Sequence, residues 1–564
     1  MINKRINILK EKFKKFKIDG YIVPKNDEYF SEYAKNDRLK NISNFSGSAG
    51  IAVLLKKKNY LFIDGRYTIQ AQRESSNNFD IIEIHKRLPH TIIKNFNLGY
   101  DPRLFTSRNL ENYFFNNSFI PINENLIDQI IEFKEKKTKP FYSLKKNIVG
   151  ESHQSKILKI VNFLKSNKAD YLFTSAPENV AWLLNIRGYD NPNSPIPNAR
   201  LIIDKNKTLF LITKKGNANK IIKEKKINKN QVIDIEALPN LINKLKGESF
   251  IIDGKSCSIF YENIIKSKFK ILNTDDPIYK LKSIKNSHEI NHTIETHKKD
   301  GLAVTKFIYW IKNINKKSIT EVEAQNKLEN FRKLNKDYLF PSFNTIAGSG
   351  SNGAIVHYRA ENKTTKKINK KDLLLVDSGG QYSYGTTDVT RTICFDSQKK
   401  SIKDAYTNVL KGHIAVALTD LSTNNTGKKI DIRARKFLKK KGLDYAHGTG
   451  HGVGFFLNVH EGPQSISKHN TIKIEEGMIL SNEPGYYKKD HFGIRIENLI
   501  YVKKLKNKLF FENLTLAPVE KDLINYKLLN KIEKDYLFKY HLNIYAEYSN
   551  LLNKKERKWL ASLI

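Results

Sequence analysis

The order of hydrophobic and polar segments in the first half of the chain occurs twice. In the first copy, the apolar strand in DGYIVPKNDEY precedes the turn ISNFSGSAG and the strands IAVLL and YLFID. In the second copy, DYLFTSAPENVAWLLNIRG precedes ARLIID and TLFLI. Each copy combines a strand, a helix-prone segment and two strands joined by a lysine-rich turn. We therefore predict two divergent copies of one α/β domain, at about 1–145 and 146–283, with KEKKTKP before Phe141 as the linker.

After Ser283 the hydrophobic spacing becomes helical. SHEINHTIETHKKDGLAVTKFIYWIKN is expected to form one helix, and SITEVEAQNKLENFRK a second one capped by Ser318 or Thr320. Strands are expected in LLLVDSGG, DVTRTICF, MILSNEPG and GIRIENLIYV, with further helices near Ser401–Leu418 and Lys428–Lys441. This alternation predicts an α+β domain at 284–503 that consists of two similar halves.

The last segment, 504–564, is expected to be a C-terminal extension. FFENLTLAPVE has the spacing of a strand, and short helices are expected through YHLNIYAEY and KKERKWLASLI. We expect Trp559 and its neighbours to pack this extension back on the preceding domain.

Composition limits the classes of protein that fit. A chain of 564 residues is too long for a single core, so several domains are expected. The net charge of +40 would suggest nucleic-acid binding, but lysine is spread through every block of fifty residues, which favours a biased compositional background over a local binding face. We therefore expect no nucleic-acid partner.

The remaining compositional features point to the cytoplasm. The two cysteines, Cys257 and Cys394, are far apart in sequence and are typical of a reducing compartment. No run of 18 apolar residues could cross a membrane, and lysines interrupt every apolar run near the N-terminus, so a secretory signal is not expected.

Two aspartates in the α+β domain suggest a cation site. Asp377 ends one apolar strand and Asp388 begins the next. If these strands pair in antiparallel fashion, the two residues can face each other with Cβ atoms about 5 Å apart. Two carboxylates at that distance repel each other, and one stays protonated unless a cation lies between them.

Two glutamates and a group of histidines extend this set. In GIRIENLIYV, strand alternation places Arg495 and Glu497 on one face, which suggests a lined cavity, and Glu483 stands at the tip of a turn that Pro484 and Gly485 form. Three histidines occur among glycines in HGTGHGVGFFLNVHEGP, where glycine allows the backbone to approach a metal or ligand closely: His447, His451 and His460.

His357 follows a second glycine-rich stretch in GSGSNGAIVHYR. This stretch lacks the Gly-Lys-Ser/Thr ending of a phosphate-binding loop, so we reject that interpretation.

The candidate ligands taken together indicate the kind of metal. Oxygen ligands with one imidazole suit hard divalent ions, and two such ions side by side suit hydrolysis.

With these residues in place, the chain resembles the pita-bread metallopeptidases, and within them the large three-domain form of aminopeptidase P, or Xaa-Pro aminopeptidase. The strings that carry the resemblance are GSGSNGAIVHYR, LLLVDSGGQYSYGTTDVTRT, HGTGHGVG, VHEGPQ, SNEPGYY and GIRIEN. NFSGSAG, IDGRY, ENVAWLLNIRG and FFENLTLAPVE extend it over nearly the whole chain. The resemblance implies two creatinase-like N-terminal α/β domains, a pita-bread α+β catalytic domain and a short C-terminal extension.

The resemblance also implies a site with two manganese ions. Asp377 would bind one ion, His451 and Glu483 the other, and Asp388 and Glu497 would bridge both. A hydroxide between the ions would attack the peptide carbonyl next to proline, and Glu483 would also be the carboxylate that moves a proton. The substrates would be peptides with proline in the second position, and the protein would be a homodimer.

Further residues match supporting positions of the family. His357 and His460 match positions that contact the substrate, His447 and Arg495 match positions that shape the site, and Tyr487 matches a tyrosine that lines it. Two alternatives remain open at this point: a prolidase, which cuts only dipeptides with the same ligands, and a non-enzymatic pita-bread scaffold that binds histones or nucleic acid. A creatinase-like hydrolase is disfavoured because that relative works without the metal ligands that are present here.

Overall fold

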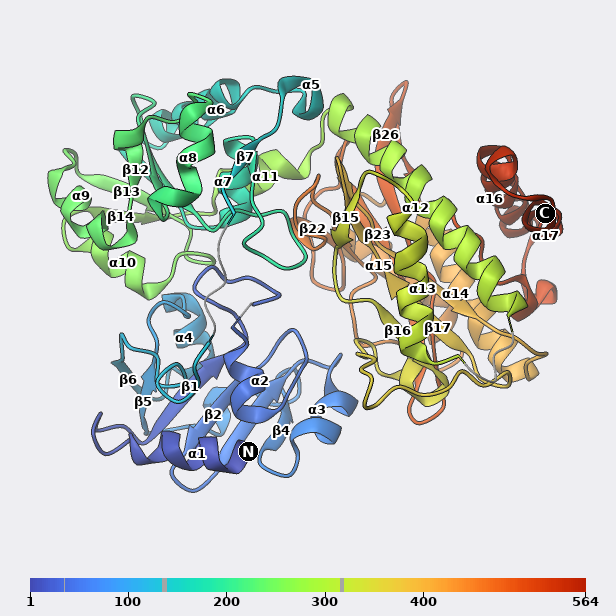
Figure 1. The fold of residues 1–564 in the computed structure, drawn as a ribbon, viewed down its shortest axis with the longest axis horizontal. Helices are drawn as coiled ribbons and strands as arrows, with labels where there is room; N and C mark the ends of the chain where they lie inside the picture. Colours follow the sequence, from blue (N-terminus) through green and yellow to red (C-terminus); the bar gives the residue numbers. More distant parts are fainter. Residues whose placement is uncertain (35, 134–138, 315–318) are drawn as a thin grey trace. The chain divides into compact units, whose positions relative to one another are not determined.

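The chain divides into two units, Met1–Tyr279 and Lys280–Ile564 (Figure 1). The computed structural model describes residues 1–34, 36–133, 139–314 and 319–564. Residues 134–138 of the predicted linker and the alternative cap Ser318 lie outside the described residues. The finer division into domains at 1–145, 146–283, 284–503 and 504–564 stays a prediction.

The first unit contains two six-stranded sheets with the same strand order. In β4-β3-β2-β1-β5-β6, β1 is antiparallel to β2 and parallel to β5. In β12-β11-β10-β8-β13-β14, β8 is antiparallel to β10 and parallel to β13. The predicted duplication is thus confirmed by topology. The strands are β1 Gly20–Pro24, β2 Ile51–Leu55, β3 Asn59–Ile63, β4 Asp80–Glu83, β5 Asn97–Tyr100, β6 Ser118–Pro121, β8 Tyr171–Thr174, β10 Arg200–Asp204, β11 Leu209–Ile212, β12 Val232–Ile233, β13 Ser249–Ile252 and β14 Lys270–Asn273, with β7 Tyr142–Ser143 and β9 Ile186–Arg187 forming a separate pair.

Helices cover the sheets of this unit because their apolar faces need a partner. Leu9 of α1 and Leu39 of α2 join Tyr21 and Leu54 of the first sheet in one buried cluster. The helices are α1 Ile2–Glu11, α2 Arg38–Ser43, α3 Thr68–Ser75, α4 Ser107–Phe114, α5 Lys146–Val149, α6 His153–Ser166, α7 Pro177–Leu183, α8 Lys215–Lys223, α9 Leu238–Lys244 and α10 Ile259–Lys266, with α11 Pro277–Ser283 at the boundary of the two units.

The second unit contains two halves, each with a pair of helices packed on a sheet. In the first half, Phe307 of α12 and Leu328 of α13 pack against Leu374 and Val376 of the sheet β16-β17-β20. The elements are α12 Ser287–Asn313, α13 Glu321–Lys333, β15 Tyr338–Pro341, β16 Ile346–Ser349, the 3-10 helix η5 Gly350–Ala354, β17 Leu374–Ser378, β18 Gly380–Tyr382, β19 Gly385–Thr386 and β20 Val389–Ile393. Thr320 caps α13, as one of the two sequence-based alternatives expected.

The second half repeats this arrangement. Val416 of α14 and Ile430 of α15 pack against Leu480 and Ile500 of the sheet β22-β21-β23-β26-β27. The elements are α14 Lys400–Ala417, α15 Gly427–Lys439, β21 Gly450–Gly452, β22 Glu461–Ile466, β23 Ile479–Asn482, β24 Gly485–Lys488, β25 Phe492–Arg495, β26 Asn498–Leu505 and β27 Lys508–Asn513. The single strand predicted for GIRIENLIYV was wrong, because β25 pairs with β24 whereas β26 pairs with β23.

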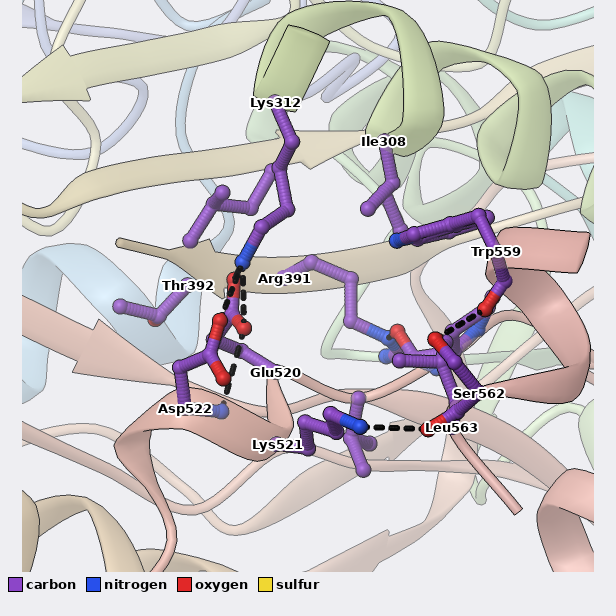
Figure 2. A pocket seen from close by; sticks show the side chains of 13 residues that line it. Ile308, Lys312, Arg391, Thr392, Glu520, Lys521, Asp522, Trp559, Ser562 and Leu563 are labelled. Atoms are coloured by element: carbon purple, nitrogen blue, oxygen red, sulfur yellow. Dashed lines mark hydrogen bonds and ion pairs between the residues drawn. The ribbon is translucent and has the colours of Figure 1, made fainter. Parts of the chain in front are cut away.

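The C-terminal extension packs on the first half of this unit, as expected. The Trp559 ring lies 5.6 Å from that of Tyr309 on α12. A pocket of about 220 Å³ lies beside Trp559. Figure 2 shows Lys312 of α12, which reaches Glu520 and Asp522 at this pocket. A short helix was expected through YHLNIYAEY, but it is part of the 18-residue helix α16, Lys531–Tyr548, whereas the expected short helix at KKERKWLASLI is present as α17, Lys554–Ala561. No helix in the described part of the chain is long and apolar enough to cross a membrane.

Candidate metal centre

The two aspartates lie at the end of β17 and just before β20. These strands are antiparallel, but Asp377 is directly opposite Thr390, and Asp388 precedes the first strand residue. The expectation that the aspartates face each other across the ladder was therefore wrong by two residues of register. Both side chains are nevertheless buried, and the charge of Asp377 acts on the pKa of Asp388.

Histidine and glutamate side chains from the second half converge on Asp388. His451 Nε2 lies 3.5 Å from Asp388 Oδ2 and 3.4 Å from Glu483 Oε1. Ligand atoms of Asp388, His451 and Glu497 all lie within 4.8 Å of one another. Four of the five candidate ligands thus lie together: Asp388, His451, Glu483 and Glu497. The fifth, Asp377, is hydrogen-bonded to Arg495 and interacts electrostatically with Glu483.

The electrostatics of this cluster show the cost of burying several carboxyl groups together. Burial, and then the charges of Asp377 and Glu483, raise the pKa of Asp388 well above its usual range. Burial, and then the charge of Asp388, have the same effect on the pKa of Glu497. Burial opposes ionisation of Glu483 as well, but His451, His447 and Arg495 outweigh it and lower that pKa.

Unpaired acceptors in this cluster fit a divalent cation. Asp377 Oδ1 and Asp388 Oδ1 are buried and have no hydrogen-bond partner among the described residues. His451 Nδ1 lies 2.9 Å from the carbonyl oxygen of Gly452 and must donate to it, so the lone pair of Nε2 faces the two carboxylates. Acceptors that converge in this way repel each other unless a cation lies among them, and the donor set of carboxylates with one imidazole suits a hard metal ion.

A chain of hydrogen bonds supports the cluster from one side. Arg495 donates to Asp377 Oδ2 at 2.5 Å and to the hydroxyl of Tyr487 at 2.6 Å. Tyr487 in turn donates to His447 Nε2 at 2.9 Å, since His447 Nδ1 donates to the carbonyl of Gly448. Burial lowers the pKa of His447 to about 4 and raises the pKa of Tyr487 to about 12, so both groups are neutral at pH 7.

The two remaining histidines lie in loops on the borders of the cluster. The ring of His460 lies 4.3 Å from the ring of His451. His357 is half-buried and follows Val356, whose carbonyl lies 3.5 Å from Arg495 Nη1. The structure thus places His460 against a candidate ligand, and it places His357 next to Val356, which contacts Arg495.

Two hydroxyl residues in the cluster were not identified from the sequence. Thr390 donates to Glu497 Oε2 at 2.6 Å and accepts from Arg495 Nε at 3.1 Å. Ser481 donates to Glu483 Oε1 at 2.9 Å and accepts from the backbone N–H of His451. The signal that could have found Thr390 is its spacing of two from Asp388, which puts both side chains on one face of an extended segment.

A second acidic cluster in the same unit does not have this character. Cys394, Glu520 and Asp522 also lie within metal-binding distance of one another. The ammonium group of Lys312 already lies 2.7 Å from Glu520 and 3.0 Å from Asp522, and it supplies the positive charge there (Figure 2). We assign no metal to this cluster.

The sequence matches family models along nearly all of its length. The model of metallopeptidase family M24 matches residues 292–504, and its C-terminal region matches 507–563. The creatinase/prolidase N-terminal domain matches twice, at 5–130 and 132–289. Xaa-Pro aminopeptidase 1 of Dictyostelium discoideum is 35% identical to this chain over 100% of it and 96% of that protein. The chain belongs to metallopeptidase family M24. Aminopeptidase P2 of Arabidopsis thaliana, another relative, is 33% identical over 96% of this chain and 85% of its own.

Solved structures resemble this M24 chain to different extents. An X-prolyl aminopeptidase from Caenorhabditis elegans, described as a cytosolic enzyme with a di-nuclear active site, matches with a TM-score of 0.92 and 27% identity. That match covers 100% of this chain and 99% of the other. The prolidase from Pyrococcus furiosus matches with a TM-score of 0.50 and 28% identity, and covers 63% of this chain and 98% of its own. The prolidase therefore has no counterpart for about a third of the M24 chain.

Proposed function

We propose that this chain is a metal-dependent aminopeptidase that releases the N-terminal residue of peptides with proline in the second position. The observation that carries the proposal is the convergence of the carboxylates with the Nε2 lone pair of His451, in a chain that full-length relatives named Xaa-Pro aminopeptidase resemble from end to end. An enzyme that needs the N–H of the scissile bond fails at proline, because proline has none, and a dedicated enzyme is required.

The proposed ligands are distributed over two divalent ions, which we propose are manganese. Asp377 would serve one ion, His451 and Glu483 would serve the other, and Asp388 and Glu497 would serve both. When bound, the two ions lower the pKa of water and stabilise negative charge on the peptide carbonyl oxygen. Arg495 keeps Asp377 oriented, and Ser481 does the same for Glu483.

The other predicted residues act on the peptide or on the proton. His357 and His460 border the candidate metal centre and steady the carbonyl oxygen or the proline ring. Glu483 is the carboxylate that we propose accepts and returns a proton, and its lowered pKa keeps it ionised and therefore able to accept one. His447 and Tyr487 hold the guanidinium of Arg495 in place. We place the enzyme in the cytoplasm as a homodimer, and the cytosolic C. elegans relative supports the first of these.

A prolidase is the second candidate, because the Pyrococcus prolidase shares this fold. The aminopeptidase is favoured by the matches to the C-terminal region and to two N-terminal domains.

The test compares Arg-Pro-Pro and Gly-Pro as substrates of the purified protein, with and without added Mn²⁺. We expect Mn²⁺-dependent release of arginine from the tripeptide at a much higher kcat/KM than dipeptide cleavage. Cleavage of Gly-Pro alone would identify a prolidase. A protein that cleaves neither peptide and binds duplex DNA in a salt-dependent manner without manganese would instead be a nucleic-acid-binding scaffold.

A further inference from the structure

A buried glutamate outside the candidate metal centre organises the loop that carries His357. Glu321 is the first residue of α13, and its side chain is fully buried. The sequence-based expectations gave this residue no role. A buried carboxyl group without such a role needs an explanation, because burial away from water is costly unless several donors satisfy its oxygens.

The donors to Glu321 come from the start, the middle and the end of the glycine-rich loop. The N–H of Ser349 donates to Oε1 at 2.7 Å, the side chain of Asn352 donates at 3.0 and 3.2 Å, and the hydroxyl of Tyr358 donates to Oε2 at 2.9 Å. The N–H of Lys366 donates to Oε2 at 2.9 Å. None of these donors is a charged group, and the position at the start of a helix favours negative charge.

The same loop also contacts the strand that carries Arg495. Gly353 lies so close to Gly493 of β25 that a Cβ atom on Gly493 would meet its carbonyl oxygen at 1.8 Å. Two residues further along β25, Arg495 reaches the carbonyl of Val356. The loop thus contacts both Glu321 and Arg495, and His357 lies in the chain between the residues that make two of these contacts, Val356 and Tyr358.

We propose that Glu321 is a positioning residue that holds His357 in place for the reaction. This inference rests on the proposed function, because His357 is the residue through which Glu321 acts. The carboxylate accepts five hydrogen bonds from four donor groups, and an amide in its place cannot. Glu321→Gln keeps the size of the side chain but replaces one of its two acceptor oxygens by an NH₂ group. Donors that bind two oxygens in the wild type then have only one, so a buried N–H loses its partner and the loop shifts.

The test is a double-mutant cycle on the metal-loaded, full-length protein with Arg-Pro-Pro as substrate. We expect Glu321→Gln to lower kcat by about tenfold or more, with KM and the number of bound ions nearly unchanged. In a His357→Ala background, the same substitution is expected to cost less than about twofold, because its effect passes through His357. Glu329→Gln, which removes a carboxylate from a Lys333 ion pair on the same helix, serves as the matched control and should leave kcat unchanged.

Several outcomes would overturn the inference. They are a wild-type kcat for Glu321→Gln, a loss of bound metal in that variant, or an equal loss of kcat in the presence and absence of the His357 side chain. If Glu321→Gln does not fold, Tyr358→Phe, which removes one of the five hydrogen bonds, replaces it in the cycle and must show the same dependence on His357. An inactive wild-type protein would contradict the proposed function. If the wild type is active but Glu321→Gln and His357→Ala lower kcat independently of each other, only the positioning role is contradicted.

Discussion

At the scale of single residues, the candidate metal centre depends on acceptors that have too few donors. Asp377 and Asp388 each have a buried oxygen that no described residue contacts by a hydrogen bond, and His451 turns a lone pair toward carboxylates. Thr390 donates a hydrogen bond to Glu497 and Arg495 donates one to Asp377, but these two bonds satisfy only some of the acceptor oxygens. Ionising all of these carboxyl groups together therefore requires further positive charge, which is the physical reason to expect cations there.

Asp388→Asn tests the proposed bridging role directly. The substitution keeps the shape of the side chain but removes the charge that both ions share, so we expect no measurable activity and fewer than two bound ions per chain. Metal analysis of the purified protein together with the Arg-Pro-Pro assay measures both effects. Asp80→Asn, which changes an exposed aspartate on β4, is the control. Full activity of Asp388→Asn would refute the bridging role.

At the scale of secondary-structure elements, a buried arginine joins the strands of the candidate metal centre to the C-terminal extension. Arg391 of β20 donates to the carbonyl of Glu497 at 2.6 Å, to the carbonyls of Ala517 and Pro518, and to the hydroxyl of Tyr540 on α16. The extension is therefore connected through one side chain to the backbone of a candidate ligand.

Arg391→Met should destabilise the second unit by about 3 kcal/mol or more, because several buried carbonyls lose a charged donor at once. We expect a lower melting temperature for this unit in calorimetry. We also expect reduced metal binding, since the carbonyl of Glu497 loses its hydrogen bond from Arg391. Arg557→Met, at an exposed position on α17, should change neither quantity. A melting temperature equal to that of the wild type would show that the extension is held by other contacts.

The elements themselves were largely predictable, but the partners of each strand were not. The helices expected near 401–418 and 428–441 are present as α14 and α15, because their apolar spacing is a local property. The break within GIRIENLIYV was missed, since it arises where the chain leaves β24 and joins β23, and no local pattern records a change of partner.

At the scale of the whole molecule, the net charge of +40 contrasts with a buried acidic cluster. The raised pKa values of Asp388 and Glu497 mean that the metal-free protein keeps protons on these groups at a pH where an unfolded carboxyl has already lost them. Folding is therefore favoured at low pH by these groups, and that contribution is lost as the pH rises from about 4 toward the raised pKa values.

Added Mn²⁺ should stabilise the protein more strongly as the pH rises. Metal binding displaces the retained protons, so the apparent affinity grows with pH, and the linked stabilisation grows with it. We expect the difference in melting temperature between metal-loaded and metal-free protein to be larger at about pH 8 than at about pH 6. Calorimetric titrations in buffers of different ionisation enthalpy should also detect proton release. A difference that does not change with pH would show that these carboxyl groups are already ionised without metal.

The sequence alone determined the duplicated α/β domains, the two-half α+β domain and the set of candidate ligands. The domains follow from local periodicity. The candidate ligands follow from glycines around histidines and from the combination of carboxylates with histidine, which is typical of metal sites. Only the tertiary structure decided that Asp377 pairs with Thr390, that Thr390 joins Glu497 to Arg495, and that Glu321 holds the loop before His357. Each of the last two joins residues far apart in the chain, and the donors available to a buried group depend on packing, which hydrophobic spacing does not encode.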